Sequence, residues 1–166
     1  MKSVLISIQP KWCELIASGK KTVEVRKTAP KLETPFKVYI YCTKGRGEAL
    51  WKYRGVYYYD TQFPNERPNT ANGKVIGEFV CDRITPTTKD HIKQIAQASC
   101  LSLSEMWEYG KKSSAYDLLG WHISDLVIYD EPKELNSFMK PYGSIIRAFD
   151  SCYIQRAPQS WCYVEG

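Results

Sequence analysis

The sequence predicts an α+β fold, in which a few short helices are segregated among mixed short strands. The first 27 residues contain a strand pattern, a helical pattern and a second strand pattern. Helical spacing returns between residues 92 and 110, and strand patterns lie on both sides of that segment. These observations together favour one sheet with helices grouped at a few places along the chain.

The N-terminal part is expected to form a strand over residues 3–8 and a short amphipathic helix over residues 10–18. Pro10 suits the first turn of this helix, and Gly19 suits its C-terminal cap. The apolar positions of the helix have helical spacing: Trp12, Leu15 and Ile16.

Residues 22–27 alternate between polar and apolar side chains, which is the period of a strand. The two valines are expected to face a core, and the polar side chains the opposite face: Thr22, Glu24 and Arg26. This polar face has two interpretations. It is either an ordinary solvent-exposed face with a screened ion pair, contributing roughly 0–1 kcal/mol, or part of a binding site.

Residues 36–43 form another predicted strand, with apolar residues on one face and an aromatic and basic second face. Tyr39 and Tyr41 lie on the second face. Base stacking, cavity lining and burial on both sides of the strand all explain this pattern, and the sequence leaves the choice open.

The strand pattern breaks between residues 44 and 73. A basic turn of Lys44, Gly45, Arg46 and Gly47 precedes a segment rich in tyrosine, and a loop with prolines and asparagines follows. Aromatic side chains interleaved with Lys and Arg are typical of single-strand nucleic-acid binders. A tyrosine-rich hairpin packed on the sheet, or a surface that binds a protein partner, also fits.

In the second half, strands are expected over residues 74–84, 123–129 and 161–164, with the chain leaving the sheet at residues 131–135. Two helices are expected between the first two of these strands, with apolar positions Ile92, Ile95 and Ala96, then Leu103, Met106 and Trp107. Ser102 or Ser104 is expected to cap the second helix and Gly110 to end it. A further turn is expected to begin at Ser113 or Ser114 and to end at Gly120.

Composition places the chain among globular proteins of single-domain size, since 43% of its 166 residues are hydrophobic and 25% are charged. The apolar N-terminal run is too short for a signal peptide, and no run approaches the roughly 20 residues of a membrane span. We therefore expect a cytoplasmic protein without a membrane partner.

The six cysteines are scattered and form no Cys-x-x-Cys pair, so buried free thiols are favoured over disulfides. His91 and His122 are far apart and show no metal-ligand spacing. The sequence therefore predicts no metal and no cofactor.

The net charge of +5 is unevenly placed, because residues 1–60 hold twelve Lys or Arg against five Asp or Glu. A positive half favours a polyanionic partner, since Lys and Arg supply the sequence-independent part of nucleic-acid affinity. An ordinary solvated surface gives the same count.

Several short motifs resemble the ASCH domains, a branch of the PUA-like superfamily, and in particular phage- and prophage-type members. Their recurring signature is a helix ending in Gly-x-Lys, followed by a strand with Glu and Arg, which occurs here as Gly19, Lys21, Glu24 and Arg26. Further matching segments are residues 38–44, 73–79, 120–123 and 157–164. The resemblance implies a PUA-like mixed β-barrel with flanking short helices, formed by residues 1–166 as one domain with a loop-rich insertion at about 44–73.

The resemblance also implies a basic cleft beside the barrel that binds RNA or a nucleotide-like ligand. Lys21 is then expected to contact phosphate, Arg26 to donate to phosphate or a base edge, and Glu24 to accept from an exocyclic amine or orient either cation. The complete set of expected binding residues is Lys21, Glu24, Arg26, Tyr41, Lys44, Arg46, Ser160 and Trp161.

Enzyme action is the alternative. Similar small bacterial ASCH proteins deacylate N4-acetylcytidine with a Lys, a Thr and a Glu. Lys21 matches the first, whereas Glu24 stands at the position of the Thr and local matching places Ser99 near the position of the Glu. Thr22 or Ser160 and Glu105 are the candidates for the missing hydroxyl and carboxylate. Ribonuclease action is a further option, with Lys21 stabilising a pentavalent phosphate and Glu24 taking a proton.

Overall fold

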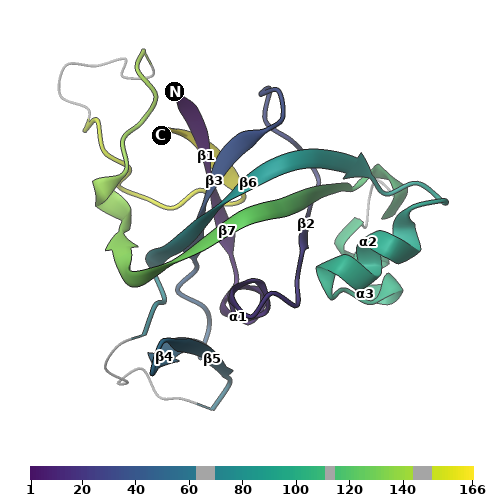
Figure 1. The fold of residues 1–166 in the computed structure, drawn as a ribbon, viewed down its shortest axis with the longest axis horizontal. Helices are drawn as coiled ribbons and strands as arrows, with labels where there is room; N and C mark the ends of the chain where they lie inside the picture. Colours follow the sequence, from purple (N-terminus) through teal and green to yellow (C-terminus); the bar gives the residue numbers. More distant parts are fainter. Residues whose placement is uncertain (63–69, 111–114, 144–150) are drawn as a thin grey trace.

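A computed structural model describes residues 1–62, 70–110, 115–143 and 151–166. Its centre is a strongly curled six-stranded sheet with the strand order β2-β7-β6-β3-β1-β8 (Figure 1). The strands of this sheet are β1 (Lys2–Ile8), β2 (Val23–Arg26), β3 (Phe36–Cys42), β6 (Lys74–Pro86), β7 (Leu119–Glu134) and β8 (Trp161–Glu165). Only β1 and β3 pair in parallel, and the other neighbours are antiparallel. The α+β prediction is confirmed.

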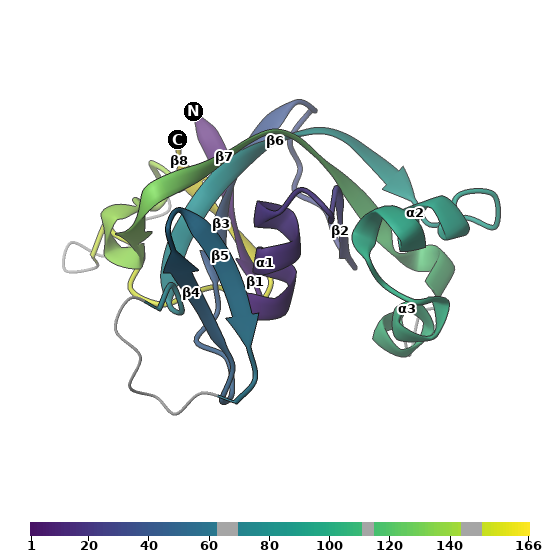
Figure 2. The ribbon, with the colours of Figure 1, turned by 60° about the horizontal axis from the view of Figure 1, so that its bottom comes forward.

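The curl comes from β6 and β7, which pair along their whole lengths with several interruptions of register. At one close approach, a Cβ added to Gly77 would clash with the backbone oxygen of Val127, so only glycine fits there. Bulges of this kind bend a sheet and increase its twist. Figure 2 shows the resulting arch, with helix α1 (Pro10–Ala17) beneath it.

Two apolar cores lie on the two faces of β1 and β3. Alternate residues of both strands pack with Cys13 and Ile16 of α1 inside the curl. The residues between them, Tyr39 and Tyr41 included, pack in a second core with Phe138 on the other face. Of the explanations for the aromatic face of β3, the structure therefore selects burial on both sides of the strand.

A third core connects β2 to two short helices, α2 (Ile92–Ser99) and α3 (Leu103–Gly110). Val23 and Val25 pack there, as the alternation predicts. A capping box begins α3, since the Ser102 hydroxyl accepts from the backbone N–H of Glu105 and the Glu105 carboxylate accepts from that of Ser102. The third core thereby fixes both helices beside the edge strand of the sheet.

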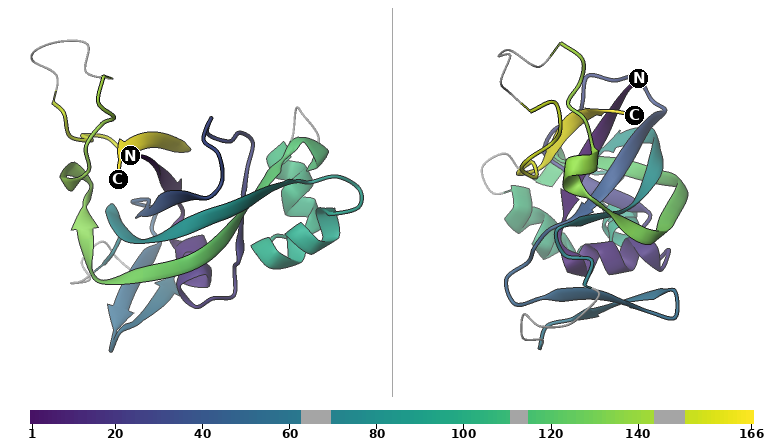
Figure 3. Two further views of the ribbon diagram at one scale, coloured as in Figure 1. Left: turned by 45° about the horizontal axis from the view of Figure 1, so that its top comes forward. Right: turned by 90° about the vertical axis from the view of Figure 1, so that its left-hand side faces the viewer.

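The segment from 44 to 73 contains a two-stranded hairpin of β4 (Ala49–Tyr53) and β5 (Val56–Asp60), which projects from the sheet and contacts α1 (Figure 3). Trp51 and Tyr58 stack across the two strands with ring centroids 4.8 Å apart. The hairpin is the alternative that the sequence left open for this tyrosine-rich segment. Most of the predicted loop after it, residues 63–69, lies outside the described residues, as do Ser113 and Ser114.

The boundaries of β7 differ from the prediction. Gly120 lies inside the strand instead of ending a turn, and the strand continues through residues 131–134 instead of leaving the sheet there. Residues 130–134 at its C-terminal end are charged residues and a proline and are mostly exposed, so this end carries no apolar alternation. Pairing with β6 along its whole length, and with β2 over residues 119–122, extends the strand beyond its sequence pattern.

All six cysteines are free thiols, as the sequence predicts. Cys13, Cys42 and Cys81 are buried, and the other three are partly exposed. Across the described ranges, no helix has both the length and the apolar character needed to span a bilayer. Those ranges also hold no group of three or more His, Cys, Asp or Glu side chains arranged to bind a metal ion.

Candidate functional site

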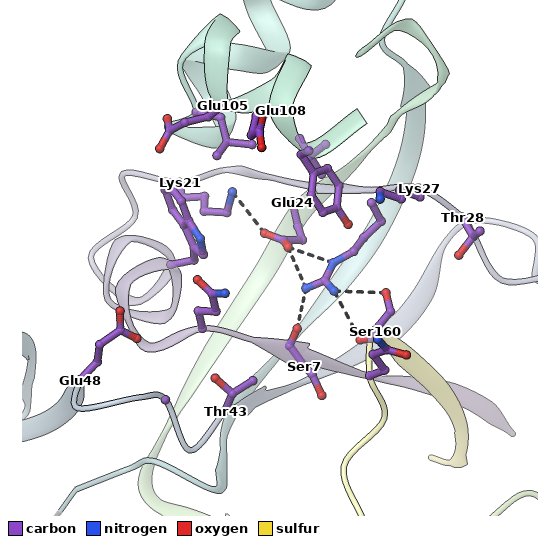
Figure 4. A pocket seen from close by; sticks show the side chains of 18 of the residues that line it. Ser7, Lys21, Glu24, Lys27, Thr28, Thr43, Glu48, Glu105, Glu108 and Ser160 are labelled. Atoms are coloured by element: carbon purple, nitrogen blue, oxygen red, sulfur yellow. Dashed lines mark hydrogen bonds and ion pairs between the residues drawn. The ribbon is translucent and has the colours of Figure 1, made fainter. Parts of the chain in front are cut away.

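A cleft of about 1250 Å³ lies beside the curled sheet, between α1, β2, α3, the turn after β3 and the turn before β8. Figure 4 shows Glu105 and Glu108 on the helix side of this cleft, with Thr43 and Glu48 on the opposite wall. The residues that line it are Ser7, Gln9, Trp12, Lys21, Glu24, Val25, Arg26, Lys27, Thr28, Thr43, Gly45, Arg46, Glu48, Leu101, Glu105, Glu108, Tyr109, Gln159 and Ser160. We call it the large cleft.

The turn after α1 aims β2 into the large cleft. Gly19 adopts a positive φ of 77°, and the backbone N–H of Lys21 then donates to the carbonyl of Leu15 at 2.9 Å. The backbone N–H of Thr22 donates to the carbonyl of Ala98 at 2.8 Å, which ties β2 to the end of α2. Alternate residues of the strand therefore point toward the cleft, while the valines between them enter the third core.

Three charged side chains meet at the floor of the large cleft (Figure 4). Oε2 of Glu24 lies 3.2 Å from Nζ of Lys21, and Oε1 lies 2.9 Å from Nη2 and 3.0 Å from Nε of Arg26. All three residues are buried, with 2–8% of their surfaces exposed. We call this arrangement the buried triad. The burial of Glu24 and Arg26 contradicts the interpretation of this polar face as an ordinary solvent-exposed face, whereas Thr22 is exposed.

The remaining donors of the buried triad are also used. Nη2 of Arg26 donates to the carbonyl of Ser7 at 2.6 Å, and Nη1 donates to the Ser160 hydroxyl at 3.2 Å. Nζ of Lys21 donates to the carbonyl of Ser99 at 2.7 Å and lies 5.1 Å from the ring centroid of Trp12. Every guanidinium nitrogen of Arg26 thus has an acceptor, so this side chain holds β1, β2 and the turn before β8 together.

The rim of the large cleft carries exposed charges of both signs. Lys27 and Arg46 are exposed cations, and the Lys27 ammonium lies 4.9 Å from the ring centroid of Tyr109. Hydrogen bonds from the Ser102 backbone lower the pKa of the Glu105 carboxyl, with smaller contributions from Lys11 and Lys21.

Among the described residues that line the large cleft, four are basic and four are acidic. The basic ones are Lys21, Arg26, Lys27 and Arg46, and the acidic ones are Glu24, Glu48, Glu105 and Glu108. The lining is therefore balanced in charge, and not predominantly basic as the sequence predicts. All four basic residues come from residues 1–60, and α3 offsets them with two carboxylates from the second half of the chain.

The structure separates the other predicted binding residues. Arg46 and Ser160 line the large cleft. Tyr41 lies in the second core, Lys44 lies against Gly73, and Trp161 packs on the first core while its indole N–H donates to the Thr28 hydroxyl at 3.0 Å. These last three side chains do not line the cleft.

Sequence reasoning missed several lining residues. Trp12 reads as a core position of its helix, yet it is only half buried and lines the large cleft. Lys27, Glu48, Glu108 and Tyr109 were not singled out. Their local patterns are those of ordinary exposed residues, and nothing in them signals that α3 and the turn after β3 face β2 across the cleft.

The candidate catalytic residues do not all line the large cleft. Glu105 and Ser160 line the large cleft together with Lys21. Thr22 faces a different pocket, and Ser99 contributes only its backbone carbonyl, as the acceptor for Lys21. The Ser160 hydroxyl accepts from Arg26, so its own proton is available for donation.

The curled sheet with its few short helices defines an α+β protein of the PUA-like type. A model of the ASCH domain matches residues 6–150, so the chain belongs to the ASCH domain family, a PUA-like family to which RNA binding is attributed. No curated protein matches the chain.

Solved structures of ASCH from Zymomonas mobilis resemble the whole fold. That protein is 20% identical, with a TM-score of 0.60, and the match covers 98% of this chain and 87% of the other. Its tyrosine-to-phenylalanine variant, also 20% identical, has a TM-score of 0.62 and a match over 99% and 91% of the two chains. At this identity the likeness establishes the shared fold.

Proposed function

We propose that this ASCH protein binds RNA by taking a nucleotide into the large cleft, with the buried triad as its floor. One observation carries the proposal: three charged side chains are buried at the base of an open cleft of about 1250 Å³. Removing charges from water is costly, and an apolar cluster of equal volume is often as stable. A paired set of charges at the base of a cleft is therefore a candidate for ligand recognition.

The shape and chemistry of the large cleft suit a nucleotide. Small-molecule pockets typically span about 300–1,000 Å³, so this volume accommodates a nucleotide together with part of its neighbours. A balanced lining suits a base, whose edges present donors beside acceptors. Glu24 retains acceptor capacity beyond its three contacts, and half-exposed Tyr109 supplies an aromatic surface.

Phosphate contacts are assigned to the rim instead of the floor. Arg26 has acceptors on every guanidinium nitrogen, whereas Lys27 and Arg46 are exposed at the edge of the large cleft. Exposed cations release counterions when they meet phosphate, which makes RNA affinity dependent on salt. In this proposal Lys27 and Arg46 bind the phosphate, in place of Arg26 and Lys21, for which the sequence predicted that contact.

Fluorescence anisotropy with a short labelled single-stranded RNA tests this assignment. The double variant Lys27→Ala/Arg46→Ala should weaken binding about tenfold at about 50 mM salt and reduce the magnitude of the log–log salt slope by about 1.4. Lys20→Ala is the control, since Lys20 is also exposed but does not line the cleft. Equal loss in the double variant and the control would contradict the proposal.

A second candidate is hydrolysis of a modified nucleoside in the same cleft. It is supported by the presence of Lys21, Glu105 and Ser160 in one lining, and by the influence of Lys21 on the pKa of Glu105. Incubation with N4-acetylcytidine at high protein concentration tests it, with cytidine release followed by chromatography. Loss of release in Ser160→Ala and Glu105→Gln would support this candidate, and absence of release from the wild-type chain would contradict it.

Three further features stay predictions from the sequence. They are the organisation of residues 1–166 as one domain, the cytoplasmic location and the prophage-type relationship. Size exclusion and limited proteolysis of the purified chain test the first of these, because one domain resists cleavage outside its exposed loops.

A further inference from the structure

A second, smaller cavity of about 430 Å³ lies near β2, where α2 faces the adjoining parts of β6 and β7. Both histidines of the chain line it, although 31 positions separate them in the sequence. We call it the histidine pocket. Its lining residues are Thr22, Val23, Arg83, Thr85, His91, Gln94, Ile95, Ala98 and His122.

Helix α2 and the strands β6 and β7 supply most of the polar groups. Along α2, lining positions recur at helical spacing from His91 through Gln94 to Ala98, so one side of the helix faces the pocket. On the sheet, Arg83 and Thr85 alternate on β6, and His122 pairs with Val23 across the β2–β7 ladder. The curl of the sheet therefore brings an arginine and two imidazoles together.

A directed chain of hydrogen bonds runs along the sheet side of the pocket. Nη2 of Arg83 lies 3.1 Å from Nδ1 of His122, and because arginine only donates, Nδ1 is the acceptor. The ring proton is therefore on Nε2, which lies 2.8 Å from the Thr85 hydroxyl oxygen and donates to it. The Thr85 hydroxyl keeps its own proton for a further acceptor. Burial, and to a lesser degree Arg83, lowers the pKa of His122, which favours this neutral form.

The helix side adds more donors. The Thr88 hydroxyl lies 2.9 Å from Nδ1 of His91, which leaves Nε2 as the nitrogen without a partner among the described residues. Gln94 adds an exposed side-chain amide. None of the described lining residues is Asp or Glu, whereas apolar side chains form part of the wall at Val23, Ile95 and Ala98. Such a site suits an anion attached to an apolar group.

We propose that the histidine pocket binds the phosphate group of a phosphate monoester, either a small phosphorylated molecule or the phosphorylated end of an RNA. Arg83, the Thr85 hydroxyl and Nε2 of His91 donate to the phosphate oxygens, and the apolar wall contacts the group that the ester carries. The proposal does not depend on the large cleft, because the two linings share no residue.

Phenyl phosphate is a suitable probe, because its ring matches the apolar wall. Two-dimensional NMR of the full-length chain should show saturable shifts of the His91 and His122 imidazole signals with phenyl phosphate, smaller shifts with inorganic phosphate and none with phenol. Arg83→Gln should weaken phenyl phosphate binding about tenfold, since it removes a charge-assisted hydrogen bond at an exposed position. Lys93→Gln is the control, because it removes the same charge from α2 outside the lining.

His91→Gln gives an independent check on the helix side and should weaken the same probe several-fold. Equal effects of Arg83→Gln and Lys93→Gln, or imidazole signals that do not respond to phenyl phosphate, would overturn the proposal. The source of the phosphate is distinguished by adding one RNA oligonucleotide with either a 5′-phosphate or a 5′-hydroxyl. Tighter binding of the phosphorylated form, abolished by Arg83→Gln, supports an RNA end, whereas identical binding of both forms beside saturable phenyl phosphate binding supports a small molecule.

Discussion

The large cleft and the histidine pocket both use residues of β2 or the turn before it, yet the cations at the floor of the cleft and the arginine of the pocket are in opposite situations. In the large cleft, Lys21 and Arg26 are buried and share the carboxylate of Glu24. In the histidine pocket, Arg83 is exposed and donates to an imidazole nitrogen instead of a carboxylate. The cations of the two sites therefore differ both in their burial and in the group that accepts their hydrogen bonds.

This difference separates two uses of positive charge. A buried cation must be fully paired, so its donors are consumed by the protein and its main contribution is to architecture. An exposed cation retains its attraction for a ligand, although water and salt weaken that attraction. We therefore expect the large cleft to depend on its floor for shape and on its rim for phosphate, whereas the histidine pocket has its cation directly available.

The largest effect is expected when the same Arg→Gln substitution is made in the large cleft and in the histidine pocket. Arg26→Gln should destabilise the protein by about 3 kcal/mol, because it leaves buried Glu24 with Lys21 as its only cation. Arg83→Gln should change stability by no more than about 0.5 kcal/mol, since the side chain is exposed. Urea denaturation followed by circular dichroism measures both. Similar losses in the two variants would show that burial does not distinguish these arginines.

A smaller effect is expected from the acidic wall of the large cleft. Glu105→Gln removes one charge while keeping a side chain that completes the capping box. RNA binding should strengthen about two- to threefold at low salt, and the gain should disappear at high salt, where the field is screened. Glu33→Gln is the control, because Glu33 is exposed and does not line the cleft. An unchanged affinity would show that the charge balance of the lining has no influence.

The smallest effect concerns the pH dependence of stability. Burial and Arg83 lower the pKa of His122 below its usual 6.5, against a weaker opposing influence of Asp82. Between the two pKa values the unfolded chain binds more protons, so His122 makes stability fall as the pH decreases through about 6.5. His122→Gln should flatten this part of the curve, measured as urea midpoints from about pH 8 to about pH 5. Saturating phenyl phosphate should reduce the slope of the wild-type protein in the same range, because a bound anion favours the protonated ring.

Local patterns predicted most individual elements. The strand of residues 3–8, the helix after it and the strand of residues 36–43 were found from apolar spacing, and Ser102 and Gly110 correctly marked the ends of α3. The length of β7 was missed, because strand pairing with β2 and β6 determines its ends. Residues 130–134 are charged or proline, so no apolar alternation marks them as part of the strand.

The sequence by itself determined the α+β class, the ASCH signature from Gly19 to Arg26 and the order of charged and apolar residues along β2. Only the tertiary structure decided that Glu24 is shared by two buried cations, that α3 brings carboxylates to the cleft, and that His91 meets His122. The physical reason is the separation along the sequence of the residues on which each property depends. Side-chain periodicity depends on neighbours within a few residues, whereas burial and pairing depend on strands and helices that the curl of the sheet brings together from distant parts of the chain.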